Sequence, residues 1–235
     1  RIAPGARVAS MLADGVDAAV LVLGAMRHGA SAPLNPAYRR QELEFYLADL
    51  RADALVVDTG IDRVATEVAS GLGLPVLTVA PDAAGSPAFQ LRTPSAPGRA
   101  VTAAAEGPAP DAALLLHTSG TTSRPKLVPL SRANVAAATN AIAGALELSS
   151  SDRCLNVMPL FHIHGLSAVF ASLAVGGSVV CAPGFLAPRF FEWYASFLPT
   201  WYTAAPTIHR AILDRASPQA QLLARHPLRF IRSAS

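Results

Sequence analysis

Hydrophobic and polar positions repeat along the chain with two different periods. Segment 39–51 has apolar residues at helical spacing, whereas segment 53–58 contains the short apolar run Ala-Leu-Val-Val that is typical of a buried strand. Helix-like and strand-like segments follow one another through most of the chain. This alternation predicts βαβ units with parallel sheet.

The pattern can be written as a set of expected elements. We predict helices over 16–28, 39–51, 61–72, 131–146, 164–175, 189–197 and 207–216, with Ser131 as an N-cap. We predict strands over 53–58, 75–80, 112–117, 154–157, 178–182, 201–205 and 228–231. Right-handed crossovers between parallel strands place helices on both faces of a sheet. The expected fold class is therefore α/β, with alternating βαβ units and parallel sheets flanked by helices.

One stretch interrupts this alternation. Segment 81–110 contains six prolines and little periodicity, which favours an exposed crossing between lobes at about 1–80 and 111–235. The chain starts with Arg1 rather than Met and ends at Ser235, directly after a strand-like run. We therefore expect residues 1–235 to be a fragment.

Composition excludes several classes of protein. With 51% hydrophobic and 15% charged residues, the chain is not predominantly disordered. The longest apolar stretch, about Ala18–Met26, is shorter than the roughly 20 residues that span a membrane. A net charge of +3 does not indicate a nucleic-acid surface. The two cysteines, Cys154 and Cys181, form neither a disulfide framework nor a metal cluster, so we expect a cytoplasmic protein.

A polar loop follows the predicted strand at 112–117. The segment HTSGTTSRPK at 117–126 holds five hydroxyl side chains, one glycine and Lys126, the only lysine of the chain. Glycine lets the backbone approach an oxyanion, successive N–H groups form an anion nest, and lysine supplies a point charge. These features predict a phosphate-binding loop. Pro125 and Leu127 exclude a Walker-type loop. A solvated Ser/Thr turn has the same composition and remains an alternative.

Several segments carry a resemblance to a known family. HTSGTTSRPK followed by LVPLSRANV resembles the phosphate-binding signature of the adenylate-forming enzymes, which include acyl-CoA synthetases, peptide-synthetase adenylation domains and luciferases. Within this family, the sequence motifs are similar to those of oxalate-CoA ligases and other small-carboxylate CoA ligases. Four more segments agree in order: GAMRHGASAPLNPAYRRQELEFYLAD (24–49), MPLFHIHGL (158–166), TWYTAAPTIHRAIL (200–213) and LRFIRSAS (228–235). The family usually has Gly where this chain has Leu127, so a loop exit that is β-like or slightly displaced is expected.

The resemblance implies an incomplete N-terminal adenylating domain without the family's C-terminal lid. It implies ATP-dependent activation of a small mono- or dicarboxylate such as oxalate to acyl-AMP, followed by thioester formation with CoA. Mg²⁺ would be held by ligands outside this chain. The implied phosphate-binding residues are Thr118, Ser119, Gly120, Thr121, Thr122, Ser123 and Lys126. The implied substrate residues are His162, His164, Gly165, Ser233 and Ser235, with Lys126 and His162 as the catalytic pair.

Other features of the sequence bear on the presence of a metal site and on the class of substrate. His162 and His164 have no third ligand at metal-binding spacing, so no resident metal is expected. No carboxylate lies between Asp152 and Glu192, which disfavours an amino-acid substrate. Two functions remain as alternatives, namely transfer of the acyl group to a carrier-protein thiol and a non-catalytic nucleotide-binding remnant. The expected partners are a small carboxylate, ATP and CoA, without nucleic acid or a membrane span.

Overall fold

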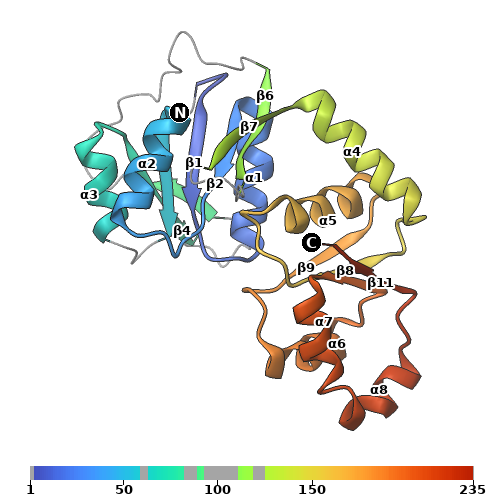
Figure 1. Cartoon of the computed structure of the whole chain (residues 1–235). Coiled ribbons are helices and arrows are strands. Elements are labelled where there is room, and N and C mark those ends of the chain that lie inside the picture. The colour runs from blue at the N-terminus through green and yellow to red at the C-terminus, as the bar shows by residue number, and fades with distance from the viewer. Residues whose placement is uncertain (1–2, 59–62, 82–88, 93–110, 119–124, 235) are drawn as a thin grey trace. The chain divides into compact units, whose positions relative to one another are not determined.

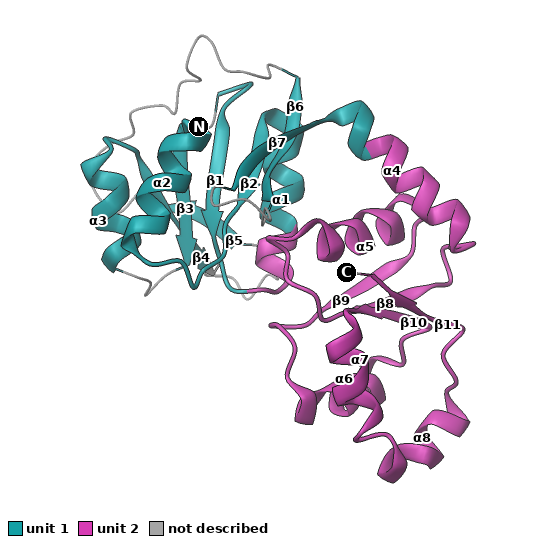
Figure 2. Cartoon of the chain, in the orientation of Figure 1, with its two compact units in different colours: residues 1–13, 20–135 teal, residues 14–19, 136–235 magenta. Residues whose placement is uncertain are grey.

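A computed structural model of the chain describes residues 3–58, 63–81, 89–92, 111–118 and 125–234. The chain forms two compact units (Figure 2). The first comprises residues 1–13 and 20–135, and the second comprises residues 14–19 and 136–235. The short segment 14–19 is therefore separated in sequence from the rest of its unit by more than one hundred residues.

The first unit is built on a seven-stranded sheet (Figure 1). Its strand order is β5-β4-β3-β1-β2-β6-β7, and every pairing is parallel except β4–β5 and β6–β7. The strands are β1 (Arg7–Met11), β2 (Ala30–Pro33), β3 (Ala54–Asp58), β4 (Val76–Pro81), β5 (Phe89–Arg92), β6 (Ala112–Thr118) and β7 (Lys126–Ser131). The helices are α1 (Val16–His28), which begins in the second unit, α2 (Arg40–Leu50) and α3 (Arg63–Gly71).

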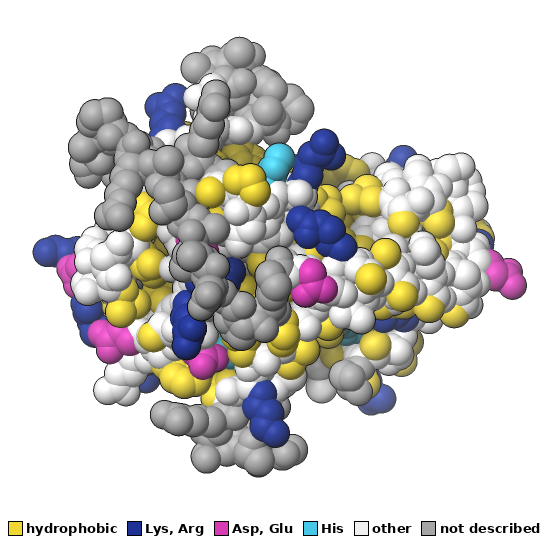
Figure 3. Space-filling view, turned by 90° about the horizontal axis from the view of Figure 1, so that it is seen from above, with side chains coloured by type: hydrophobic (Ala, Val, Ile, Leu, Met, Phe, Trp, Pro, Cys, Tyr) yellow, Lys and Arg dark blue, Asp and Glu magenta, His cyan; other side chains and the backbone are white. Residues whose placement is uncertain are grey.

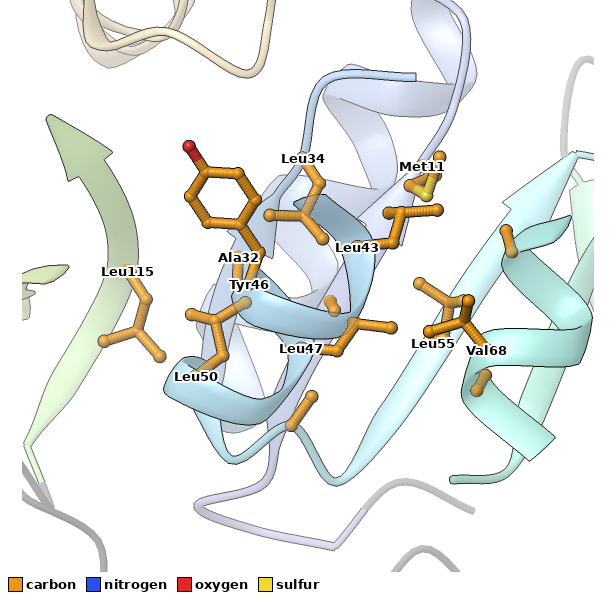
Figure 4. Close-up of a cluster of buried hydrophobic side chains, with 14 of the residues drawn as sticks. Met11, Ala32, Leu34, Leu43, Tyr46, Leu47, Leu50, Leu55, Val68 and Leu115 are labelled. Carbon is orange, nitrogen blue, oxygen red and sulfur yellow. The ribbon is translucent and has the colours of Figure 1, made fainter. Parts of the chain in front are cut away.

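The core of this unit forms between α2, α3 and the sheet. The four residues that α2 buries are spaced as the sequence predicts for one helix face: Leu43, Tyr46, Leu47 and Leu50. They lie in one cluster with Leu55 of β3 and Leu115 of β6 (Figure 4). Burial of such large apolar side chains is the main force that fixes the helix on the sheet.

The second unit contains a four-stranded, all-parallel sheet of order β11-β10-β8-β9 (Figure 1). The strands are β8 (Arg153–Asn156), β9 (Ser178–Cys181), β10 (Trp201–Ala204) and β11 (Phe230–Ser233). The helices are α4 (Arg132–Ala145), which begins in the first unit, α5 (Ile163–Ala174), α6 (Phe190–Phe197), α7 (Pro206–Leu213) and α8 (Ala220–Arg225). Ala168 of α5 packs with Cys154 and Trp201 on one face, while α6 and α7 cover Leu155 and Tyr202 on the other.

The structure confirms the predicted α/β fold class and most of the predicted elements. Ser131 caps α4 as expected, because its Oγ accepts the backbone N–H of Asn134 at 3.1 Å. The sequence analysis did not predict β1, β2, β5 or β7. In β1, buried Arg7 interrupts the apolar run and is accommodated by Asp53, whose Oδ2 lies 3.4 Å from Nε.

The division between the units also differs from the expected lobes. Both β6 and β7 follow the proline-rich segment in sequence, yet β6 pairs with β2 and β7 pairs with β6 in the first sheet. The compact units instead divide near residue 135. Strand pairing, which the local composition does not reveal, sets this boundary.

Two surface properties bear on function. None of the helices among the described residues has the length and hydrophobicity of a transmembrane segment. On the face shown in Figure 3, basic and acidic side chains are interspersed.

Candidate functional site

The predicted phosphate-binding loop connects β6 and β7. These strands form an antiparallel ladder in which Thr118 is opposite Lys126. The Thr118 hydroxyl lies 3.5 Å from the Lys126 carbonyl oxygen, and the Lys126 side chain is exposed. The predicted contacts of Ser119, Gly120, Thr121, Thr122 and Ser123 fall outside the described residues and remain predictions. The hairpin therefore places the two ends of the motif side by side.

Leu127 leaves the loop in an extended conformation. It lies within β7, opposite His117, and its side chain packs against the core of the first unit. This confirms the expected β-like exit. A leucine is compatible with this position because strand backbone does not require the left-handed conformation that favours glycine.

His117 anchors the base of the same hairpin. Its Nε2 lies 2.9 Å from Oδ2 of Asp49, and its side chain is only 5% exposed. Its ring meets the ring of Tyr46 edge-on at 4.6 Å, and Tyr46 stacks on Tyr38 at 4.5 Å. A histidine held on two sides in this way fixes the end of β6 from which the loop departs.

A row of polar side chains crosses the second sheet near the carboxyl ends of its strands. The strand register aligns Thr203 of β10 with Asn156 of β8 on one side and with Arg232 of β11 on the other. Side chains in register on parallel strands share a face, here the face that α5 covers. Ligands of open α/β sheets characteristically bind beyond the carboxyl ends of the strands.

Three hydrogen bonds join the start of α5 to this row of polar side chains. The Asn156 side-chain amide donates to the Gly165 carbonyl at 3.3 Å, and Arg232 Nη1 donates to Ser167 Oγ at 3.2 Å. His164 Nε2 lies 2.6 Å from Thr203 Oγ1. The predicted pocket residues His164 and Gly165 are thus brought together with residues that the sequence analysis did not single out.

Gly165 is required by a close backbone approach. A Cβ at this position would lie 2.4 Å from the Pro159 carbonyl oxygen and 2.7 Å from that of Met158. These distances are far below ordinary van der Waals contact, so only glycine fits. Gly165 therefore shapes the turn that carries the two histidines rather than offering a functional group.

The electrostatic environment keeps His164 neutral. Burial lowers its pKa to about 4, and the positive charge of Arg232 and the neighbouring His209 and His162 act in the same direction. Burial also lowers the pKa of Arg232, but a guanidinium remains cationic at physiological pH. No carboxylate of the described residues forms an ion pair with Arg232. The cluster therefore offers a cation and a neutral imidazole to an anionic ligand.

His162 lies at the N-cap of α5, with extended backbone and an exposed side chain. Partial burial lowers the pKa of its imidazole, and the nearby carboxylate of Asp14 opposes this effect. The Phe161 ring lies 4.6 Å from the imidazole ring. An imidazole in this position can donate a hydrogen bond to an anion near the start of the helix.

The two predicted serines are placed differently. Ser233 is exposed at the end of β11, and strand alternation turns its side chain to the face opposite Arg232. Ser235 lies outside the described residues. The sequence analysis missed Arg232, Thr203 and Asn156, although a charged residue within the strand-like LRFIRS segment was a signal that could have identified Arg232.

The described side chains can be compared with the groups that bind a metal ion or a nucleotide phosphate. Among the described residues, no group of three or more His, Cys, Asp or Glu side chains could hold a metal ion. The exposed ammonium of Lys126 and the hydroxyl of Thr118, at the two ends of the loop, are groups that suit a nucleotide phosphate.

Comparisons with known proteins identify the family of the chain. The AMP-binding enzyme family matches residues 1–234. Oxalate–CoA ligase of Arabidopsis thaliana is 39% identical over 240 residues, covering 100% of this chain and 46% of that protein. Sulfoacetate–CoA ligase of Cupriavidus necator is 36% identical over 239 residues, covering 98% and 44%.

Solved structures give the same result. The ATP-bound structure of MatB from Rhodopseudomonas palustris has a TM-score of 0.78 and 28% identity, covering 100% of this chain and 45% of that one. This chain spans less than half the length of these relatives. Because the family match runs from residue 1 to residue 234, the chain belongs to the AMP-binding enzyme family.

Proposed function

We propose that the natural protein carrying this sequence is an ATP-dependent ligase that joins a small dicarboxylate, such as oxalate, to CoA. Membership of the AMP-binding enzyme family supports the adenylating chemistry. Relatives named for ligation of oxalate and sulfoacetate support a short substrate with two anionic ends. Mg²⁺ would accompany ATP, and we expect its protein ligands to lie outside this chain.

The proposed reaction has two steps. One carboxylate oxygen of the acid attacks the α-phosphorus of ATP, and pyrophosphate leaves. The CoA thiol then attacks the activated acyl carbon, and AMP leaves with the bonding electron pair. Both steps depend on positioning and on neutralisation of developing charge. We assign Lys126 and the 118–123 loop to the leaving pyrophosphate, and His162 to the region of the reacting carboxylate.

The observation that carries the dicarboxylate proposal is the environment of Arg232. Its guanidinium lies at the carboxyl end of a parallel sheet, beside a neutral His164 and without a carboxylate partner among the described residues. A guanidinium can bind a carboxylate through two parallel hydrogen bonds. Arg232 is therefore suited to the carboxylate of the substrate that does not react, with His164 and Thr203 as neighbouring hydrogen-bonding groups.

The test is substrate discrimination by Arg232→Met in the natural polypeptide. Pyrophosphate release is measured with oxalate and with acetate, which lacks the second carboxylate. We expect kcat/KM for oxalate to fall about 10- to 100-fold, the effect of losing a charged hydrogen bond, while kcat/KM for acetate changes little. Arg210→Met is the control, because Arg210 is an exposed arginine of the same unit. Equal losses for both acids would contradict the proposal.

Lys126→Ala tests the nucleotide side of the proposal. Loss of its positive charge is expected to weaken ATP binding and to lower turnover by about 10²- to 10³-fold with any acid. The thermal midpoint should stay nearly constant, because the Lys126 side chain is exposed. Lys126→Arg is the control for charge, and unchanged ATP affinity in Lys126→Ala would contradict the assignment. Product analysis with CoA and with a phosphopantetheinyl carrier protein identifies the acceptor.

A further inference from the structure

Asp14 precedes α1 but bonds to a distant part of the second unit. Its Oδ1 accepts the backbone N–H of Leu160 at 2.7 Å across 146 positions of sequence. Leu160 is buried, and it lies in the turn between β8 and α5 that ends at His162. The carboxylate therefore contacts the segment that delivers His162 to the start of α5.

The other bonds of this turn are local. The Met158 amide donates to Asn156 Oδ1 at 3.1 Å, and the His162 amide donates to the Pro159 carbonyl at 3.3 Å. Among the residues that the structure describes, Asp14 is the acceptor that reaches the turn from outside the β8–α5 segment. A charged acceptor makes a stronger hydrogen bond than a neutral one, so this contact constrains the turn more than the local bonds do.

The same carboxylate lies within electrostatic range of His162. The negative charge of Asp14 raises the pKa of His162, and the positive charge of His162 lowers the pKa of Asp14, each against the effect of burial. Asp14 also interacts electrostatically with Cys181, and His162 interacts electrostatically with His164. Burial raises the pKa of Cys181 to about 11 and lowers that of His164 to about 4, so both stay uncharged near neutral pH.

We propose that Asp14 is a positioning residue that holds the Met158–His162 turn through the Leu160 amide and acts as the counter-charge of His162. The inference rests on the proposed function only in giving His162 a part in the reaction. Asp14 itself touches no reacting atom. Its role is to fix where the imidazole lies and to favour its protonated form.

The test separates the hydrogen bond from the charge. Asp14→Asn keeps an oxygen acceptor for Leu160 but removes the negative charge, whereas Asp14→Ala removes both. Asp17→Asn is the matched control, because Asp17 is a nearby exposed acid, in the first turn of the helix that follows Asp14. The pKa of His162 is measured by NMR of labelled imidazoles in the natural polypeptide, with the signal assigned through His162→Gln.

We expect the pKa of His162 to fall in Asp14→Asn, because loss of the neighbouring negative charge disfavours the imidazolium, and to stay constant in Asp17→Asn. Hydrogen exchange of the Leu160 amide should become about tenfold faster or more in Asp14→Ala and change less in Asp14→Asn. An unchanged His162 pKa in Asp14→Asn, or equal falls in both asparagine variants, would overturn the proposal. Neither readout requires substrate turnover, so they stand independently of the proposed ligase activity.

Discussion

Each end of the four-stranded sheet has an arginine beside buried polar groups. The two arginines differ in their hydrogen-bond partners and in whether a carboxylate balances their charge. At the amino end, Asp152 is 3% exposed and accepts hydrogen bonds from Arg229 at 3.0 and 3.1 Å. It also accepts the Thr200 hydroxyl at 2.8 Å and the Ser149 amide at 2.8 Å. At the carboxyl end, Arg232 bonds to the hydroxyl of Ser167, and no carboxylate of the described residues pairs with it.

This difference separates a cluster that is satisfied within the chain from the cluster that we propose as a binding site. The charge of the Asp152 carboxylate is balanced by Arg229, so this carboxylate is not suited to bind an external ligand. The Arg232 guanidinium keeps hydrogen-bonding capacity that an anion can use. Similar residue types therefore stabilise the fold at one end of the sheet, and at the other end we propose that they recognise a ligand.

The largest expected effect on stability comes from breaking the amino-end pair. Arg229→Met leaves the buried Asp152 carboxylate without its cation and is expected to lower the free energy of unfolding by about 2–3 kcal/mol. This is less than for a fully buried pair, because the Arg229 side chain is 40% exposed. Arg232→Met should cost less than about 1 kcal/mol. Urea unfolding of both variants compares the two ends directly, and equal losses would remove the distinction.

An effect of similar or smaller size is expected at the carboxyl end from the backbone contact of Gly165. Gly165→Ala introduces a Cβ at 2.4 Å from the Pro159 carbonyl oxygen and should destabilise by about 1–3 kcal/mol. The control is Gly144→Ala on α4, where a Cβ meets nothing within 4 Å. That variant should be more stable than the parent by up to about 1 kcal/mol, because alanine favours a helix. Thermal unfolding measures both, and a neutral Gly165→Ala would show that the turn can move.

The smallest effect concerns pH. Hydrogen bonds from Ser149, Thr200 and Arg229, together with the charge of Arg229, hold the pKa of Asp152 below its ordinary value, although burial opposes them. The stability that this carboxylate contributes is therefore fully present above about pH 4, its unfolded value, and is lost as the pH falls through the lower folded value.

Asp152→Asn tests this dependence. The variant should be less stable than the parent at pH 7, and the difference should shrink as the pH is lowered below about 4. Urea unfolding at a series of pH values gives the comparison. A difference that is independent of pH would mean that packing, rather than charge, accounts for the loss.

Sequence periodicity predicted the helices well because the residues of one helix face lie close together in the sequence. The burial of Leu43, Tyr46, Leu47 and Leu50 follows from their spacing alone. Strands were harder to predict, since β1 contains the buried Arg7 and β5 lies inside the proline-rich segment. Their assignment depends on partners far away in sequence, which a local pattern does not contain.

The same distinction between local and long-range information applies to the candidate site. The sequence by itself determined the phosphate-loop motif, the family resemblance and the two histidines of the FHIHG segment, because these are contiguous residues. Only the tertiary structure decided that Asn156, Thr203 and Arg232 form one row, since strand register aligns residues that lie 47 and 29 positions apart. It also decided that Asp14 bonds to Leu160. Motifs are encoded locally, whereas a charge and its partners are brought together by strand pairing and burial, which depend on the whole chain.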